Sequence, residues 1–150
     1  MRCGCFAKAA INGDRLPRHQ YLVRVLLGQS PLLAEWGTWD RAYTSELAGV
    51  EARRVIDRMR LDGVLDDEGV VLAQEQLARL EAGVGRINLS RVVLRRASLP
   101  MATAVKTLDA IHLATALLFQ ERRAVSLAFA THDVQQAKAA RALGFTCIGV

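Results

Sequence analysis

AVKTLDAIHLATALLFQERR, at residues 104–123, carries the strongest helical pattern of the chain, and the segments that follow it decide the fold. VSLAFATHD, at residues 125–133, has the apolar run and β-branched residues of a buried strand. VQQAKAARALG, at residues 134–144, predicts an amphipathic helix, and FTCIGV, at residues 145–150, predicts a closing strand. This alternation indicates an α/β fold, in which helices cover a mostly parallel sheet.

Upstream of residue 104, the same periodicity predicts further helices and short strands. Apolar residues repeat with helical spacing from Ser45, and again from Asp66, where two acids suit the positive end of a helix. The predicted elements are a helix at 21–29, a strand at 41–44, helices at 45–62 and 66–82, a strand at 87–90 and a helix at 91–98. Residues 1–20 contain turn formers and no clear period, so we divide the chain into an atypical N-terminal segment, 1–20, and one domain, 21–150.

The composition restricts the class of protein. The chain has 150 residues, of which 51% are hydrophobic and 23% charged, and these proportions exclude disordered and collagen-like proteins. An aromatic content of 5% argues against a stacking platform for single-stranded nucleic acid. The formal net charge of +5 permits a polyanionic partner such as RNA without indicating one.

The cysteines and the hydropathy pattern point to the cytoplasm. Cys3, Cys5 and Cys147 are odd in number and outline no disulfide framework, which is typical of a reducing compartment. Cys3 and Cys5 alone make no zinc site. The first residues contain no sustained apolar run, and no later run approaches the length of a membrane span. We therefore expect a cytoplasmic protein without a membrane partner.

Two acids occupy apolar helix faces. Glu51 lies on a mostly apolar stripe, with Arg54 the only charge one turn away. A carboxylate there needs a cation or hydrogen bonds, so Glu51 is either a functional acid or an edge residue paired with Arg54. Asp109 repeats this pattern in the middle of an apolar face. If its helix starts at Thr107, however, Asp109 is a first-turn acid favoured by the helix dipole.

A third acid, Asp133, follows a predicted strand and precedes a helix. An N-cap is the structural interpretation of this position. The position also lies just past the carboxyl end of a parallel strand, where such folds bind ligands. We predict that Glu51, Asp109 and Asp133 converge in one pocket, and oxygen ligands suit Mg²⁺ or Mn²⁺. His112 and His132 lack metal-site spacing and stay outside the predicted ligand set.

Three segments together resemble a known family. They are TSELAGVEARR at residues 44–54, TLDAIHLATA at 107–116 and ATHD at 130–133, with residues 137–144 behind them. The chain resembles a PIN domain of the VapC toxin type from about Leu22 to Val150, and TLDAIHLATA is the most specific part. The resemblance implies a three-layer α/β/α domain with a central, mostly parallel sheet, a metal-dependent ribonuclease site and a cognate antitoxin.

The resemblance assigns the same three acids to the catalytic metal site. The family's acid in the helix after the second strand falls on Glu51, the acid of the TLDA helix on Asp109, and the acid after the fourth strand on Asp133. The first strand is degenerate, because Arg18 stands where the family has its first acid and the nearest acid, Asp14, lies too early. Either the chain is a variant with a weakened metal site, or its start is misassigned.

The expected function is that of a toxin that hydrolyses RNA phosphodiesters with Mg²⁺ or Mn²⁺ held by Glu51, Asp109 and Asp133. The alternative is a catalytically impaired PIN-like module that binds RNA or an antitoxin without cutting. A phosphoacceptor receiver domain has a similar architecture, but it needs paired acids after its first strand, which the start of this chain lacks.

The expected partner surface lies in the first predicted helices. Large apolar side chains gather there, and exposed apolar patches usually mark contact sites. They are Leu22, Val25, Leu26, Trp36 and Trp39. We expect an amphipathic antitoxin helix to bind this surface, with homodimerisation as the competing use. Residues 1–20 are not expected to form a central strand, because Pro17 lacks a ladder donor and Asn12-Gly13 favours a turn.

Overall fold

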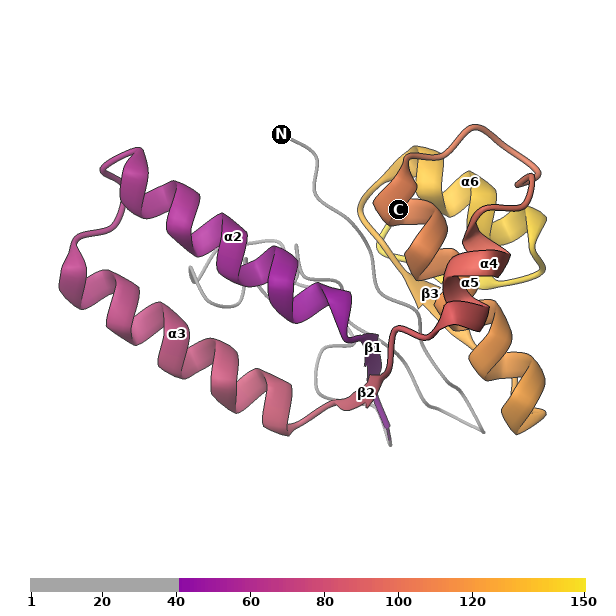
Figure 1. Ribbon diagram of the computed structural model, residues 1–150, viewed down its shortest axis with the longest axis horizontal. Coiled ribbons are helices and arrows are strands. Elements are labelled where there is room, and N and C mark those ends of the chain that lie inside the picture. The colour runs from indigo at the N-terminus through magenta and orange to yellow at the C-terminus, as the bar shows by residue number, and fades with distance from the viewer. Residues whose placement is uncertain (1–40) are drawn as a thin grey trace.

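The computed structural model describes residues 41–150, which form a mixed α/β structure of five helices and four short strands (Figure 1). In chain order these are β1 (Tyr43–Ser45), α2 (Leu47–Leu61), α3 (Asp67–Ala82), β2 (Gly85–Ile87), α4 (Arg91–Ala97), α5 (Thr107–Arg123), β3 (Ala128–Ala130), α6 (Val134–Ala142) and β4 (Thr146–Ile148). The predicted α/β class is confirmed. Within residues 41–150, no helix is both long and apolar enough to cross a membrane.

Every prediction that concerns residues 1–40 lies outside the described residues. These predictions are the atypical segment 1–20, the helix at 21–29, the place of the first acid at Arg18 or Asp14, the thiols of Cys3 and Cys5, and the apolar surface of Leu22, Val25, Leu26, Trp36 and Trp39.

The strands pair in parallel, as expected. Thr44 of β1 lies opposite Arg86 of β2, and Phe129 of β3 lies opposite Cys147 of β4. Parallel neighbours need crossover connections, which α2 and α3 supply for the first pair and α6 for the second. Among the described residues the two pairs form separate two-stranded sheets. One central sheet in a three-layer PIN-like fold therefore stays a prediction.

The strand predicted at 87–90 was wrong in position, because β2 occupies Gly85–Ile87. The ring of Tyr43 on β1 lies where a Cβ of Gly85 would be, so glycine permits this close approach of the two strands. Ser90 ends the extended segment: its hydroxyl accepts a hydrogen bond from the Val93 amide at 3.3 Å and caps α4.

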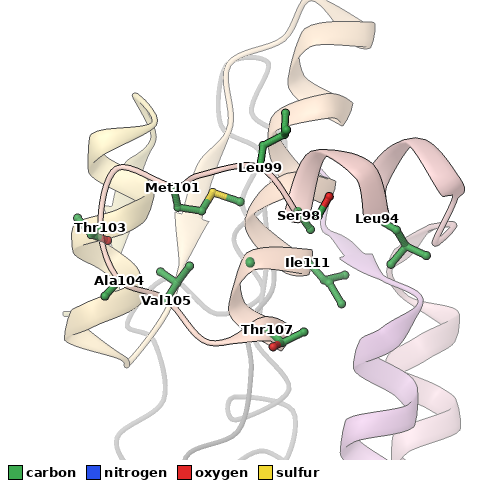
Figure 2. Close-up of a pocket in the computed structure, with 11 residues that line it drawn as sticks. Leu94, Ser98, Leu99, Met101, Thr103, Ala104, Val105, Thr107 and Ile111 are labelled. Carbon is green, nitrogen blue, oxygen red and sulfur yellow. The ribbon is translucent and has the colours of Figure 1, made fainter.

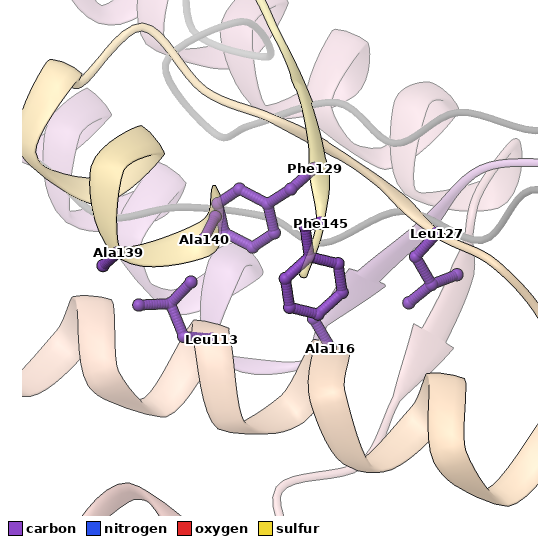
Figure 3. Packing of buried hydrophobic residues seen from close by; sticks show 7 residues of the cluster. All are labelled: Leu113, Ala116, Leu127, Phe129, Ala139, Ala140 and Phe145. Atoms are coloured by element: carbon purple, nitrogen blue, oxygen red, sulfur yellow. The ribbon is translucent and has the colours of Figure 1, made fainter. Parts of the chain in front are cut away.

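The main core lies between α5, α6 and the β3–β4 pair (Figure 3). Its buried members are Leu113, Ala116, Leu127, Phe129, Ala139, Ala140 and Phe145. The ring centroids of Phe129 and Phe145 lie 5.7 Å apart in a tilted arrangement. Tyr43 extends this core from β1, with its ring centroid 4.7 Å from that of Phe119 on α5. Helix α5 thus packs against residues of both strand pairs.

Helices α2 and α3 form a hairpin that projects away from α5 and α6 (Figure 1). It has a small buried cluster of its own, made by Ala52, Ile56, Ala73 and Leu77. The Asp66 carboxylate caps α3 by accepting a hydrogen bond from the Gly69 amide at 2.8 Å. At the other end, Arg53 of α2 makes two hydrogen bonds of 2.7 Å to the Glu81 carboxylate of α3. The hairpin therefore brings its own packing and its own ion pair.

Candidate functional site

Asp109 lies in the first turn of α5. This confirms the alternative in which Asp109 is a first-turn acid of a helix that starts at Thr107. The helix begins at Thr107, and Lys106 occupies the N-cap position without a side-chain cap. A carboxylate in the first turn is favoured by the helix dipole. Asp109 Oδ1 also accepts a hydrogen bond of 3.2 Å from the side-chain amide of Gln136, which comes from α6. This bond connects the start of α5 to the start of α6.

Asp133 is the N-cap of α6, so the structural interpretation of this acid is also confirmed. Its Oδ1 accepts hydrogen bonds from the amides of Gln135 at 2.8 Å and Gln136 at 3.2 Å. The Asp133 amide donates to Thr131 Oγ1 at 3.0 Å, directly beyond the end of β3. Both capping bonds use one carboxylate oxygen. Capping and binding a ligand through the other oxygen are therefore compatible.

Gln136 connects the two aspartates and was missed in the sequence. Its side chain is 1% exposed, its Oε1 accepts from the Thr131 hydroxyl at 3.0 Å, and its amide nitrogen donates to Asp109. A buried amide that bonds at both ends holds its neighbours in fixed positions. The sequence feature that could have indicated this role is the position of Gln136 on the same helix face as Ala137 and Ala140, which is the buried face of α6.

Asp109 and Asp133 line the same pocket. Its volume is about 280 Å³, and its remaining lining comes from Ala104, Val105, Lys106, Gln135 and Gln136. The ammonium of Lys106 is the positive side chain in this lining. The N-termini of α5 and α6 both border the pocket, and helix N-termini favour anions. The pocket thus combines two carboxylates with features that attract a phosphate.

Glu51 lines a different pocket from Asp109 and Asp133. Its side chain is buried on α2, and its Oε2 lies 2.8 Å from Nε2 of His112, which is 1% exposed on α5. Arg54, the partner that the spacing suggested, pairs instead with Asp57 at 2.9 Å. The sequence predicts no ligand role for His112, because it has no metal-site spacing with a second histidine or cysteine. Its contact with an acid 61 residues away explains how two buried polar groups compensate each other.

Glu51 and Asp109 border neighbouring pockets. Glu51 lines a pocket of about 390 Å³ along α2, to which Leu108 of α5 also contributes. Asp109, the next residue, lines the smaller pocket with Asp133. The two pockets therefore lie against consecutive residues at the start of α5. The structure brings Asp109 and Asp133 together, whereas the convergence of Glu51 with them stays a prediction.

Cys147 is a half-buried free thiol. It lies on β4, where its thiol donates to the carbonyl oxygen of Ala137 at 3.4 Å. Burial raises the pKa of this thiol, which lowers the fraction of reactive thiolate at neutral pH. The acidic pocket is the better candidate for chemistry.

A divalent metal site can be tested against the residues of the pocket. Within residues 41–150, no cluster of three His, Cys, Asp or Glu side chains is arranged to hold a metal ion. Mg²⁺, however, commonly uses one or two carboxylates and fills its other positions with water and substrate phosphate oxygens. Asp109 and Asp133 supply that number of carboxylates on one pocket, so the donor set fits this ion.

The sequence matches no protein-family model and no curated protein.

Proposed function

We propose that the chain is a metal-dependent endoribonuclease of the VapC-type PIN class. The observation that carries the proposal is the shared pocket of Asp109 and Asp133, held together by Gln136. Two acids that the sequence singled out independently lie on one pocket at the end of a parallel strand. In folds of this architecture, that edge is where ligands bind.

The residues of the pocket have distinct tasks in this proposal. Asp109 and Asp133 would hold Mg²⁺ or Mn²⁺, which supplies charge neutralisation at the phosphodiester and a water of lowered pKa. Lys106 and the helix N-termini attract and orient the phosphate backbone. Gln136 fixes the Asp109 carboxylate, and His112 fixes Glu51, which we retain as the third acid of the site.

A second candidate function is binding of RNA or an antitoxin without cleavage. The observation that favours it is Arg18, which stands where the resemblance calls for the first acid. Loss of one carboxylate weakens the hold on a divalent cation. Such a protein would keep the fold and the partner surface but would no longer cleave RNA.

The experiment incubates the full chain with a structured RNA in Mg²⁺, in Mn²⁺ and in EDTA. We expect cleavage in either metal and none in EDTA. Asp109→Asn keeps the shape of the side chain but removes its charge, so we expect a loss of about 10²-fold or more in rate. Asp67→Asn is the matched control, because Asp67 is also a first-turn acid but belongs to α3.

Each result decides between the candidates. Cleavage that needs metal and Asp109 supports the nuclease. RNA binding without cleavage supports the non-catalytic module. Unchanged cleavage in Asp109→Asn would refute the assignment of the site.

The proposed biological partner is a cognate antitoxin in the cytoplasm. Its expected surface around Leu26 and Trp36 rests on the sequence alone. Replacing both residues with serine should weaken association with an antitoxin, or with a second copy of the chain, without changing metal-dependent cleavage. Unaltered pull-down and sedimentation behaviour would remove this surface from the proposal.

A further inference from the structure

A third cavity adjoins the pocket of Asp109 and Asp133, which we call the acidic pocket, and has a different chemistry. It has a volume of about 490 Å³ and lies between the end of α4, the connection to α5 and the first turns of α5 (Figure 2). Its lining is mainly apolar and includes Leu94, Leu99, Met101, Val105 and Ile111. The volume falls in the range of roughly 300–1,000 Å³ that is typical of small-molecule sites. We call this cavity the apolar pocket.

One polar atom in the apolar pocket has no hydrogen-bond partner. The hydroxyl oxygen of Thr103 is buried, and within the described part of the chain nothing accepts from it or donates to it. Buried hydroxyls in proteins are normally satisfied, because leaving one without a partner costs free energy. An apolar pocket with a single unsatisfied hydroxyl suits a flat apolar ligand that carries a polar edge.

The apolar pocket and the acidic pocket share a wall. Ala104 and Val105 line both cavities, and Lys106 follows them on the acidic side. Arg96 of α4 lies 4.0 Å from the Sδ atom of Met101, which lines the apolar pocket. Lys106 and Arg96 therefore lie next to residues of a pocket that is one residue away from the carboxylates.

We propose that the apolar pocket receives one unpaired nucleobase of the RNA strand whose phosphate lies at Asp109 and Asp133. The flat faces of the base lie against the apolar side chains, and its polar edge pairs with the hydroxyl of Thr103. Lys106 and Arg96 supply positive charge for the neighbouring phosphates. Proteins commonly read single-stranded RNA by accepting a splayed-out base in this way. This inference rests on the proposed RNA substrate. It assigns to the apolar pocket the recognition of one base of the RNA.

The test measures binding rather than cleavage, so it is independent of the chemistry. The full chain is titrated, in EDTA and at low salt, with fluorescent single-stranded RNAs that carry one abasic nucleotide, moved along the strand. We expect one position at which loss of the base weakens binding about tenfold, because the apolar surface buried between the base and the pocket is lost. At that position, the four bases should also differ in affinity.

Two pairs of variants locate the effect in the apolar pocket. Thr103→Val removes the hydroxyl at nearly constant shape and should flatten the differences among the bases, whereas Thr103→Ser should restore them. Leu99→Glu puts a negative charge at the pocket and should remove the abasic effect. Leu72→Glu is the matched control, because Leu72 is 52% exposed on α3 and Leu99 is 53% exposed.

The outcomes separate this inference from the proposed function. Metal-dependent cleavage without any base-sensitive position would overturn the base pocket and leave the nuclease standing. Base-sensitive binding without cleavage would support the pocket and the non-catalytic module. A chain that binds no RNA at low salt, or whose Thr103→Val variant keeps the full base preference, would contradict the inference, and an apolar side chain of a protein partner would become the better occupant.

Discussion

The α2–α3 hairpin and the C-terminal region, residues 107–150, are built on different cores. The hairpin buries two alanines, one isoleucine and one leucine, and Arg53 and Glu81 pair across it. The C-terminal region buries two phenylalanines and two leucines between helices and strands. The candidate acids of the two regions also differ in where their neighbours lie. Glu51 of the hairpin contacts His112 on α5, whereas Asp109 and Asp133 of the C-terminal region line the same pocket. The larger core therefore positions the better supported part of the candidate site.

The largest expected effect comes from the C-terminal core. Phe129 is fully buried and packs its ring against that of Phe145. Phe129→Ala should lower the free energy of unfolding by about 3–5 kcal/mol, because it removes an aromatic ring and leaves a cavity. Denaturant titration measures this loss. A change below about 1 kcal/mol would show that the C-terminal core is not the main source of stability.

The hairpin core should give a smaller and more local effect. Leu77→Ala removes a fully buried side chain from a small cluster that can partly close around the gap. We expect a loss of about 2–3 kcal/mol, at the lower end for such substitutions. Amide hydrogen exchange should accelerate in α2 and α3 and stay slow in α5. Equal acceleration in both regions would mean that the hairpin does not open separately.

The contact between the two regions can be weakened at Glu51. Glu51→Ala leaves the buried His112 without its partner at 2.8 Å, and we expect a loss of about 1–3 kcal/mol. Glu51→Gln should cost less, because its amide can still form a hydrogen bond with the imidazole. Comparing the two variants by thermal unfolding checks the bond itself. Equal losses would show that the packing of the side chain, rather than the hydrogen bond, is what matters.

The smallest effect is expected at the Arg53–Glu81 ion pair of the hairpin, and it depends on pH. The hydrogen bonds from Arg53 hold the pKa of Glu81 below its ordinary value of 4.5. A depressed pKa in the folded state means that the stabilisation is present above the unfolded pKa and is lost as the pH falls through the folded one. Glu81→Gln should therefore cost under about 1 kcal/mol at pH 7, and nothing at a pH below the folded pKa of Glu81. A cost that persists in acid would contradict this interpretation of the pair.

The helices of both regions could be predicted from their sequences, because their apolar periods and caps are local. Helix α5 was expected at 104–123 and begins at Thr107, and the helix expected at 45–62 is α2, Leu47–Leu61. The capping role of Asp133 was likewise expected from the order of strand and helix. Periodicity and capping therefore suffice for these helices, whereas β2 occupies Gly85–Ile87 rather than the predicted 87–90.

The partners of the buried polar residues could not be predicted in this way. Spacing along α2 suggests Arg54 as the partner of Glu51, whereas in the structure Glu51 contacts His112 on another helix and Arg54 pairs with Asp57. Gln136 is 27 residues away from Asp109 in the chain. A buried polar residue indicates that some partner exists, but only the tertiary packing determines which one it is.

The central claim is that Asp109 and Asp133 form one site for a divalent cation, and direct titration of the full chain with Mn²⁺ tests it most closely. Electron paramagnetic resonance distinguishes free from bound Mn²⁺ for the wild type and for Asp109→Asn, Asp133→Asn and Asp67→Asn. Asparagine also caps helices well, so Asp133→Asn should keep α6 intact. We predict that Asp109→Asn and Asp133→Asn each weaken the same bound ion by about tenfold or more, and that Asp67→Asn leaves it unchanged. Mn²⁺ binding that survives in either of the first two variants would contradict the account.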